Sequence, residues 1–127
     1  MRNPAHKQLW RAEKESVPLT PVPYRDAFTP EEFRTICSGL VPRSMEEKWY
    51  VLFETPYLLF FRSWTGRLIY RMRVDQDLSG ARVVDAEVLD NPEFYKRGSA
   101  DFEVSMLSWL VRRLLLHQDV PLPMRAG

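Results

Sequence analysis

The sequence predicts an α+β fold in which an antiparallel β-meander of about four strands carries an N-terminal and a C-terminal helix on one face. Three observations predict it. Apolar residues recur at helical spacing near both ends of the chain, four runs rich in aromatic and β-branched residues lie between them, and short turn-like segments separate those runs. Because short loops join antiparallel strands, neighbouring runs are expected to be neighbours in the sheet.

The composition is that of one globular domain. The chain has 127 residues, of which 45% are hydrophobic and 13% aromatic, enough to build a core. The chain has 18 basic and 17 acidic residues, so its net charge does not favour nucleic acid as a partner. One cysteine excludes an internal disulfide framework, and we find neither a signal peptide nor an apolar run of about 18 residues. We therefore expect a cytoplasmic protein without a membrane partner.

Prolines divide the chain. Residues 1–28 are predicted to be a Pro-rich arm, extended against the body at least from Val17 onward, because repeated prolines break helices and central strands. Residues 29–119 form the expected single α+β domain, and residues 120–127 a short tail.

The first helix is expected over residues 30–38. Thr29 is its N-cap, Pro30 occupies the first helical position and Glu32 completes a capping box. Cys37 falls late in this amphipathic helix, where a small buried thiol is the usual arrangement.

The four predicted strands are Lys48–Glu54, Tyr57–Arg62, Arg67–Val74 and Ala81–Val88, with a turn over Asp75–Gly80. Alternation predicts that Trp49, Val51 and Phe53 share one face of the first strand, with Lys48, Tyr50 and Leu52 on the other. In the third strand, Leu68, Tyr70, Met72 and Val74 are expected on one face and Arg67, Ile69, Arg71 and Arg73 on the other. Arg71 and Arg73 are expected to pair with Asp85 and Glu87 on the next strand. A short helical turn is expected around Glu93–Lys96.

The last helix, expected over residues 101–117, has more apolar surface than one sheet face can cover. Ser99 is its predicted cap, and Asp101 and Glu103 suit the positive end of the helix dipole. We predict that Phe102, Met106, Trp109 and Arg113 contact another protein, most simply a second copy in a homodimer. The alternative is that the excess is covered within the chain, by Leu9 and Trp10 of the arm or by the tail.

Arginine and aromatic residues interleave over residues 43–73, and the turn between the second and third strands concentrates them. Arg62, Trp64, Thr65 and Arg67 are predicted to bind a small anionic or nucleotide-like ligand, because guanidinium forks bind phosphate or carboxylate and aromatic faces stack on planar groups. Such a site would bring these side chains together with a carboxylate such as Glu54. The alternative is structural, with Trp64 folded back onto the sheet.

The same stretch resembles a motif of small uncharacterised bacterial proteins. The matching residues are Lys48-Trp49-Tyr50, then Leu59-Phe60-Phe61-Arg62-Ser63-Trp64-Thr65-Gly66, then Ile69-Tyr70, about a quarter of the chain. The resemblance implies a shared fold and carries no activity.

No catalytic, metal or cofactor motif is recognisable: Gly-rich phosphate loops and a nucleophile elbow are absent, and the two histidines lie far apart in the chain. The leading hypothesis is therefore a non-catalytic binding or protein-interaction module, like immunity proteins and antitoxins in size alone. The alternative is a small anionic-ligand or nucleotide-binding domain, an enzyme included, centred on the Arg62–Arg67 hairpin.

Overall fold

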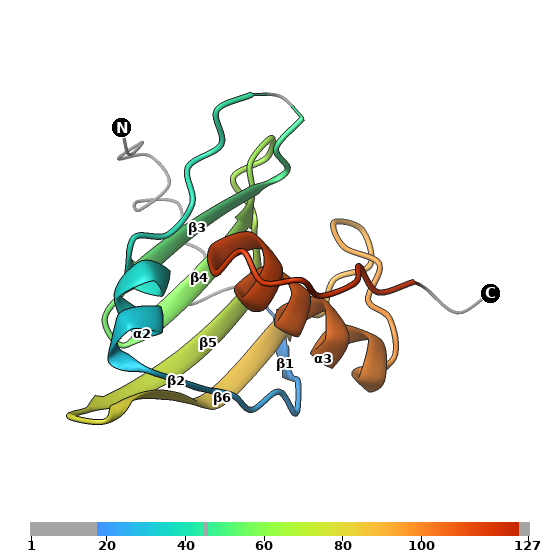
Figure 1. The fold of residues 1–127 in the computed structure, drawn as a ribbon. Helices are drawn as coiled ribbons and strands as arrows, with labels where there is room; N and C mark the ends of the chain where they lie inside the picture. The colour runs from blue at the N-terminus through green and yellow to red at the C-terminus, as the bar shows by residue number, and fades with distance from the viewer. Residues whose placement is uncertain (1–17, 45, 125–127) are drawn as a thin grey trace.

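A computed structural model of the protein describes residues 18–44 and 46–124, and shows a curved antiparallel sheet with its helices on one face (Figure 1). The predicted cover by Leu9 and Trp10 lies outside the described residues. The elements are β1 (Leu19–Pro21), β2 (Ala27–Phe28), α2 (Pro30–Cys37), β3 (Trp49–Glu54), β4 (Tyr57–Arg62), β5 (Leu68–Asp77), β6 (Gly80–Leu89), α3 (Ala100–Ser108) and the π-helix η1 (Trp109–Leu115).

The sheet has the order β1-β6-β5-β4-β3, and β2 also pairs with β6. The prediction of about four strands was too low, because β1 and β2 lie in the segment expected to be an extended arm. Leu19 pairs with Leu89 and Phe28 with Ala81, so the two short strands follow one another along the outer edge of β6. Sequence alternation could not reveal strands of two and three residues.

The first helix begins as predicted. The Thr29 hydroxyl accepts a hydrogen bond from the Glu32 amide at 3.1 Å, and the Glu32 carboxylate accepts one from the Thr29 amide at 3.0 Å. This capping box satisfies two backbone donors that a helix start would otherwise leave unbonded. Phe33 and Ile36 then turn into the core.

The helix-bearing face of the sheet holds the main core. Trp49 and Val51 of β3 contribute to it, with Phe53 packed against it, whereas Tyr50 and Leu52 belong to a second buried cluster, as alternation predicted. The same main core includes Ile36 of α2 and Leu107 of α3, so both helices cover one face (Figure 1).

The predicted alternation of β5 fails at its first two residues. Leu68 joins the second cluster, whereas Ile69 and Tyr70 both belong to the main core. The cause is a β-bulge: Phe60 pairs with Tyr70 but Phe61 pairs with Leu68, so two β5 residues oppose one step of β4. Burial of Leu68, Tyr70 and Met72 relative to the arginines of β5 is nevertheless confirmed.

The expected turn over Asp75–Gly80 is shorter than predicted. Both β5 and β6 extend into it, and Asp77 pairs directly with Gly80. Gly80 has φ 137°, and a Cβ atom there would lie 2.0 Å from the Phe28 carbonyl oxygen. Only glycine therefore allows β2 to approach the first residue of β6 this closely.

Across β5 and β6, one of the two predicted ion pairs forms. Arg71 donates from Nε to Glu87 at 2.9 Å. Arg73 lies opposite Asp85 in the register but contacts Asp75 on its own strand, at 3.9 Å, so the expected partner was wrong. Both Arg73 and Asp75 are exposed, where ion pairs contribute little.

The last helix covers residues 100–115, close to the predicted 101–117, but changes type within this range. Ser99 caps α3 by accepting from the Phe102 amide at 3.1 Å, and from Trp109 the helix continues as a π-helix. The Leu116 amide donates to the Val111 carbonyl at 3.0 Å, which is the wider i→i−5 spacing. None of the helices within the described residues is long and apolar enough to cross a membrane.

Arg112 of this helix joins three segments. It donates to Asp26 from two nitrogens, at 3.1 and 2.6 Å, and to Glu32 at 3.2 Å. Burial disfavours the charge on Asp26, but hydrogen bonds from Arg112, Tyr24 and the Ala27 amide outweigh it and lower the pKa of that carboxyl. The helix end is thereby held against the chain between β1 and α2.

Candidate anion-binding site

The Arg62–Arg67 turn is tightly closed. The Arg62 amide donates to the Arg67 carbonyl at 2.9 Å, and the Gly66 amide donates to the Arg62 carbonyl at 2.8 Å. Gly66 has φ 69°, a left-handed conformation that favours glycine. Ser63 ties the turn to the start of β3, because its amide donates to the Lys48 carbonyl and its hydroxyl to the Glu47 carbonyl at 2.7 Å.

The four residues predicted to bind a ligand line one small cavity. Its volume is about 260 Å³, and its lining consists of Lys48, Arg62, Trp64, Thr65, Arg67 and Phe94. Trp64 is 70% exposed, so it does not fold back into the core as the structural alternative required. Glu54, the carboxylate expected to converge on this site, lies at the opposite end of β3, where it pairs with Tyr57.

Two of the arginines are held by aromatic rings. The Arg62 guanidinium carbon lies 4.5 Å from the centre of the Trp49 ring, and that of Arg67 lies 3.6 Å from the centre of the Phe94 ring. Such stacking restricts a guanidinium while leaving its N–H groups able to donate. Phe94 was not among the predicted site residues, because it comes from a turn after β6 that is distant in sequence.

A larger cavity of about 570 Å³ adjoins the first. It lies between the α2–β3 loop, the paired ends of β3 and β4, and the last helix. Its lining comprises Leu40, Arg43, Glu46, Glu47, Lys48, Trp49, Arg62, Met106, Trp109, Arg113, Leu114, His117 and Leu122. Lys48 and Arg62 are common to both cavities.

The larger cavity is rich in cationic side chains. Four lysine or arginine residues and His117 line it, against the two carboxylates of Glu46 and Glu47. The Glu47 carboxylate accepts a hydrogen bond from the Arg43 amide. Within residues 18–44 and 46–124, none of Lys48, Arg62 and Arg113 forms an ion pair. Their donors therefore remain available to an anion.

The end of the last helix contributes through an unusual backbone. His117 adopts φ 60°, and the following Gln118 amide donates back to the Arg112 carbonyl at 2.8 Å. A left-handed conformation is uncommon for a residue with a side chain, although histidine is enriched there. This ending, one turn after Arg113, places both side chains in the lining of the cavity.

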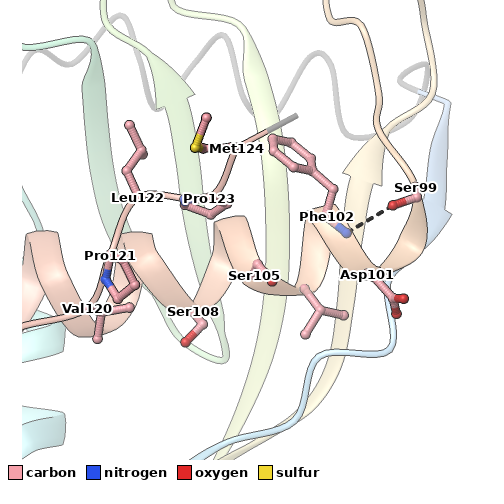
Figure 2. A pocket seen from close by; sticks show the side chains of 11 residues that line it. Ser99, Asp101, Phe102, Ser105, Ser108, Val120, Pro121, Leu122, Pro123 and Met124 are labelled. Atoms are coloured by element: carbon pink, nitrogen blue, oxygen red, sulfur yellow. Dashed lines mark hydrogen bonds between the residues drawn. The ribbon is translucent and has the colours of Figure 1, made fainter. Parts of the chain in front are cut away.

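The four residues predicted as an interface do not all lie in one place. Met106, Trp109 and Arg113 line the 570 Å³ cavity, whereas Phe102 lines another of about 600 Å³ between α3 and the tail. Figure 2 shows the tail running beside α3, with Leu122, Pro123 and Met124 near the helix. Leu122 borders both cavities, so the tail lies between the two groups.

A buried polar cluster behind the site was missed by sequence reasoning. Glu103, for which the sequence indicated only a favourable place in the first turn of the helix, is 1% exposed. It accepts hydrogen bonds from the Tyr70 and Tyr95 hydroxyls and from the Gly98 amide, the last at 2.7 Å. Burial, with Tyr95 and Glu103 close by, raises the pKa of Tyr70, so its hydroxyl stays protonated and able to donate.

This cluster positions the turn that carries Phe94. Tyr95 follows Phe94 directly, and the Phe94 and Tyr95 amides both donate to the Asn91 carbonyl, at 3.1 and 3.0 Å. The Tyr70 ring also lies 6.0 Å from the Trp49 ring. Aromatic groups of both cavities are thus supported by one hydrogen-bonded core cluster.

Other reactive groups in the part of the chain that the structure describes have no comparable setting. Burial raises the pKa of the Cys37 thiol, which keeps it protonated. Among the described residues, no group of three or more His, Cys, Asp or Glu side chains is placed to hold a metal ion.

Comparisons with protein-family models, with curated proteins and with solved structures gave no match.

Proposed function

We propose that this chain is a non-catalytic binding module whose ligand is a small organic anion that carries a flat ring. One observation carries the proposal: Lys48, Arg62 and Arg113 converge on a 570 Å³ cavity without an ion pair from any described carboxylate. Trp109 supplies ring surface in the same lining, where the buried Trp49 ring supports the Arg62 guanidinium. The volume lies within the range of about 300–1,000 Å³ usual for small-ligand sites.

The chemistry of the lining indicates which part of the ligand meets which side chain. Two guanidinium groups and one ammonium group suit a phosphate or carboxylate, to which arginine can donate two parallel hydrogen bonds. The half-buried ring of Trp109 suits a planar apolar group. Because Lys48 and Arg113 are exposed, binding should weaken as salt concentration rises.

A titration with two probes tests the proposal. AMP presents a phosphate and indole-3-acetate a carboxylate, each beside a flat ring, and adenosine is the neutral control. We expect the indole NMR signals of Trp49 and Trp109 to shift with at least one anionic probe at millimolar concentration, and less with adenosine.

Charge-neutral variants locate the site. Arg62→Gln and Arg113→Gln should each weaken binding about tenfold, because each removes a charge-assisted hydrogen bond. Arg73→Gln is the matched control, since Arg73 is an exposed arginine of β5 outside both cavities. If neither probe shifts the indole signals, or if Arg73→Gln weakens binding as much as Arg62→Gln, the proposed function is wrong.

We also propose a homodimer, on a different observation. Leu122 and Met124 of the tail are 58% and 89% exposed, and they extend the apolar surface beside Phe102 (Figure 2). Exposed apolar patches are typical of contact surfaces, and a second copy is the simplest partner.

A further inference from the structure

The two cavities of the candidate site share the side chains of Lys48 and Arg62, which are here called the cationic wall. Lys48 and Arg62 are the two described residues that line both of them. The two residues come from neighbouring strand ends, because Lys48 directly precedes Trp49 and Trp49 pairs with Arg62 in the register, and both side chains reach the shared lining. A ligand that filled both cavities would therefore pass over positive charge at its middle.

Each cavity has aromatic side chains of its own, and in the larger one the Trp49 ring lies beneath the Arg62 guanidinium. Trp49 and Trp109 line the larger cavity, and Trp64 and Phe94 line the smaller one. Trp64 is 70% exposed, and Phe94, whose ring also contacts the Arg67 guanidinium, is 45% exposed, so part of each side chain is accessible from solvent. Across the site, an aromatic side chain of the larger cavity is thus followed by the two cationic side chains and then by an aromatic side chain of the smaller cavity.

The wall is held in place before any ligand arrives. The Ser63 amide donates to the Lys48 carbonyl at 2.9 Å, which ties the hairpin turn to the residue before β3. The Trp49 ring beneath the Arg62 guanidinium is 6% exposed and packed in the main core. Little conformational freedom of the backbone would be lost when an anion binds there.

From this arrangement we infer that the ligand is a dinucleotide, two nucleosides joined by phosphate, with the phosphate at Lys48 and Arg62 and one base in each cavity. The inference rests on the proposed function and names its ligand class. A mononucleotide leaves one aromatic surface unused, whereas two bases joined through phosphate use both surfaces and the shared cations. The smaller cavity, at 260 Å³, falls below the usual size of a separate ligand site, which fits a compartment for one base.

Two sources could supply this chemistry, a free dinucleotide and a stretch of single-stranded nucleic acid. A strand-binding protein tracks the backbone with a positively charged groove, whereas this chain has a formal net charge of +1. The free dinucleotide is therefore the ligand that we infer.

The experiment compares adenylyl-adenosine, AMP and a ten-residue oligoadenylate, titrated into the full chain by calorimetry. We expect adenylyl-adenosine to bind about tenfold more tightly than AMP, in line with one added base–aromatic contact. Trp64→Ala and Phe94→Ala should each remove most of that gain. Both side chains are largely outside the core, and Leu78→Ala, at a fully exposed position in the β5–β6 turn, is the matched control.

The outcomes separate this inference from the proposed function. Equal affinities for AMP and adenylyl-adenosine, both weakened by Arg62→Gln, would refute the two-base ligand and leave the anion site standing. An oligoadenylate that binds much more tightly than adenylyl-adenosine would overturn the free dinucleotide in favour of a strand. If no probe binds, the inference fails together with the proposed function.

Discussion

Glu103→Gln should destabilise the fold measurably, although it changes one atom and removes no volume. The two carboxylate oxygens accept from three donors: the Tyr70 and Tyr95 hydroxyls and the Gly98 amide. An amide offers one acceptor oxygen and adds a donor. If its oxygen faces the Gly98 amide, its NH₂ group faces the two tyrosine hydroxyls. These hydroxyl oxygens lie 2.9 Å apart, so one hydroxyl can donate to the other, but the proton of the second hydroxyl then has no acceptor.

At least one buried donor then loses its acceptor, which costs about 1–3 kcal/mol. The remaining bonds also lose their charge assistance, while the desolvation cost of a carboxylate disappears. We expect a net loss of about 2 kcal/mol in the free energy of unfolding, and a larger loss of about 4 kcal/mol for Glu103→Ala, which also opens a cavity.

Urea denaturation measures the effect as a fall in midpoint at constant slope. With a slope of about 1–3 kcal/mol per molar urea, the Glu103→Gln midpoint should fall by about 1 M. Asp101→Asn is the control, because it makes the same change on an exposed acid in the first turn of the same helix. A Glu103→Gln midpoint equal to that of Asp101→Asn would refute the hydrogen-bond argument.

Three further predictions concern the rest of the molecule. Arg112→Met should cost about 2 kcal/mol at neutral pH, between the values for exposed and buried pairs. The fold lowers the pKa of Asp26, so the stabilisation that its carboxylate contributes is present above the ordinary pKa of an aspartate and is lost as pH falls through the lowered pKa. The free energies of unfolding of the wild type and Arg112→Met should therefore converge in strong acid. A difference that stays constant with pH would contradict this. Gly80→Val should lower the free energy of unfolding, measured by urea denaturation, by at least about 2 kcal/mol. The backbone conformation at Gly80 is strained for any residue with a side chain, and the Phe28 carbonyl oxygen occupies the place of its Cβ atom. An unchanged urea midpoint would show that β2 can move away freely. Light scattering over a concentration series should give twice the monomer mass of 15.0 kDa, and Leu122→Glu should restore the monomer without unfolding; a constant monomer mass rules out the dimer.

Features encoded by neighbouring residues were predictable from the sequence. The capping box at Thr29 and Glu32 needs only two residues three apart, and the alternation of β3 needs only its own six residues. The turn carrying Arg62, Trp64, Thr65 and Arg67 was also recognisable, and all four line one cavity.

Features that depend on contacts between distant segments were not predictable. Glu103 is a favourable first-turn acid in any isolated helix, and nothing nearby in sequence indicates that Tyr70 and Tyr95 will surround it. The bulge at Ile69 depends on the register of β4, not on the composition of β5. Arg113 and Phe94 likewise reach the site from elements that are remote in the chain.

The pairing of β1 and β2 with one strand, β6, affects how the molecule reaches its native state. Leu19 and Leu89 are bonded neighbours, as are Phe28 and Ala81, although each pair is separated by about 50 to 70 residues of chain. During synthesis the first strands made must wait for the last one before they can pair. Once β6 has paired with β5, its other edge presents unpaired amides and carbonyls to other chains until β1 and β2 pair with it, and such edges are a usual route to aggregation. Variants that loosen β2 should therefore reduce the yield of refolding more than they reduce equilibrium stability.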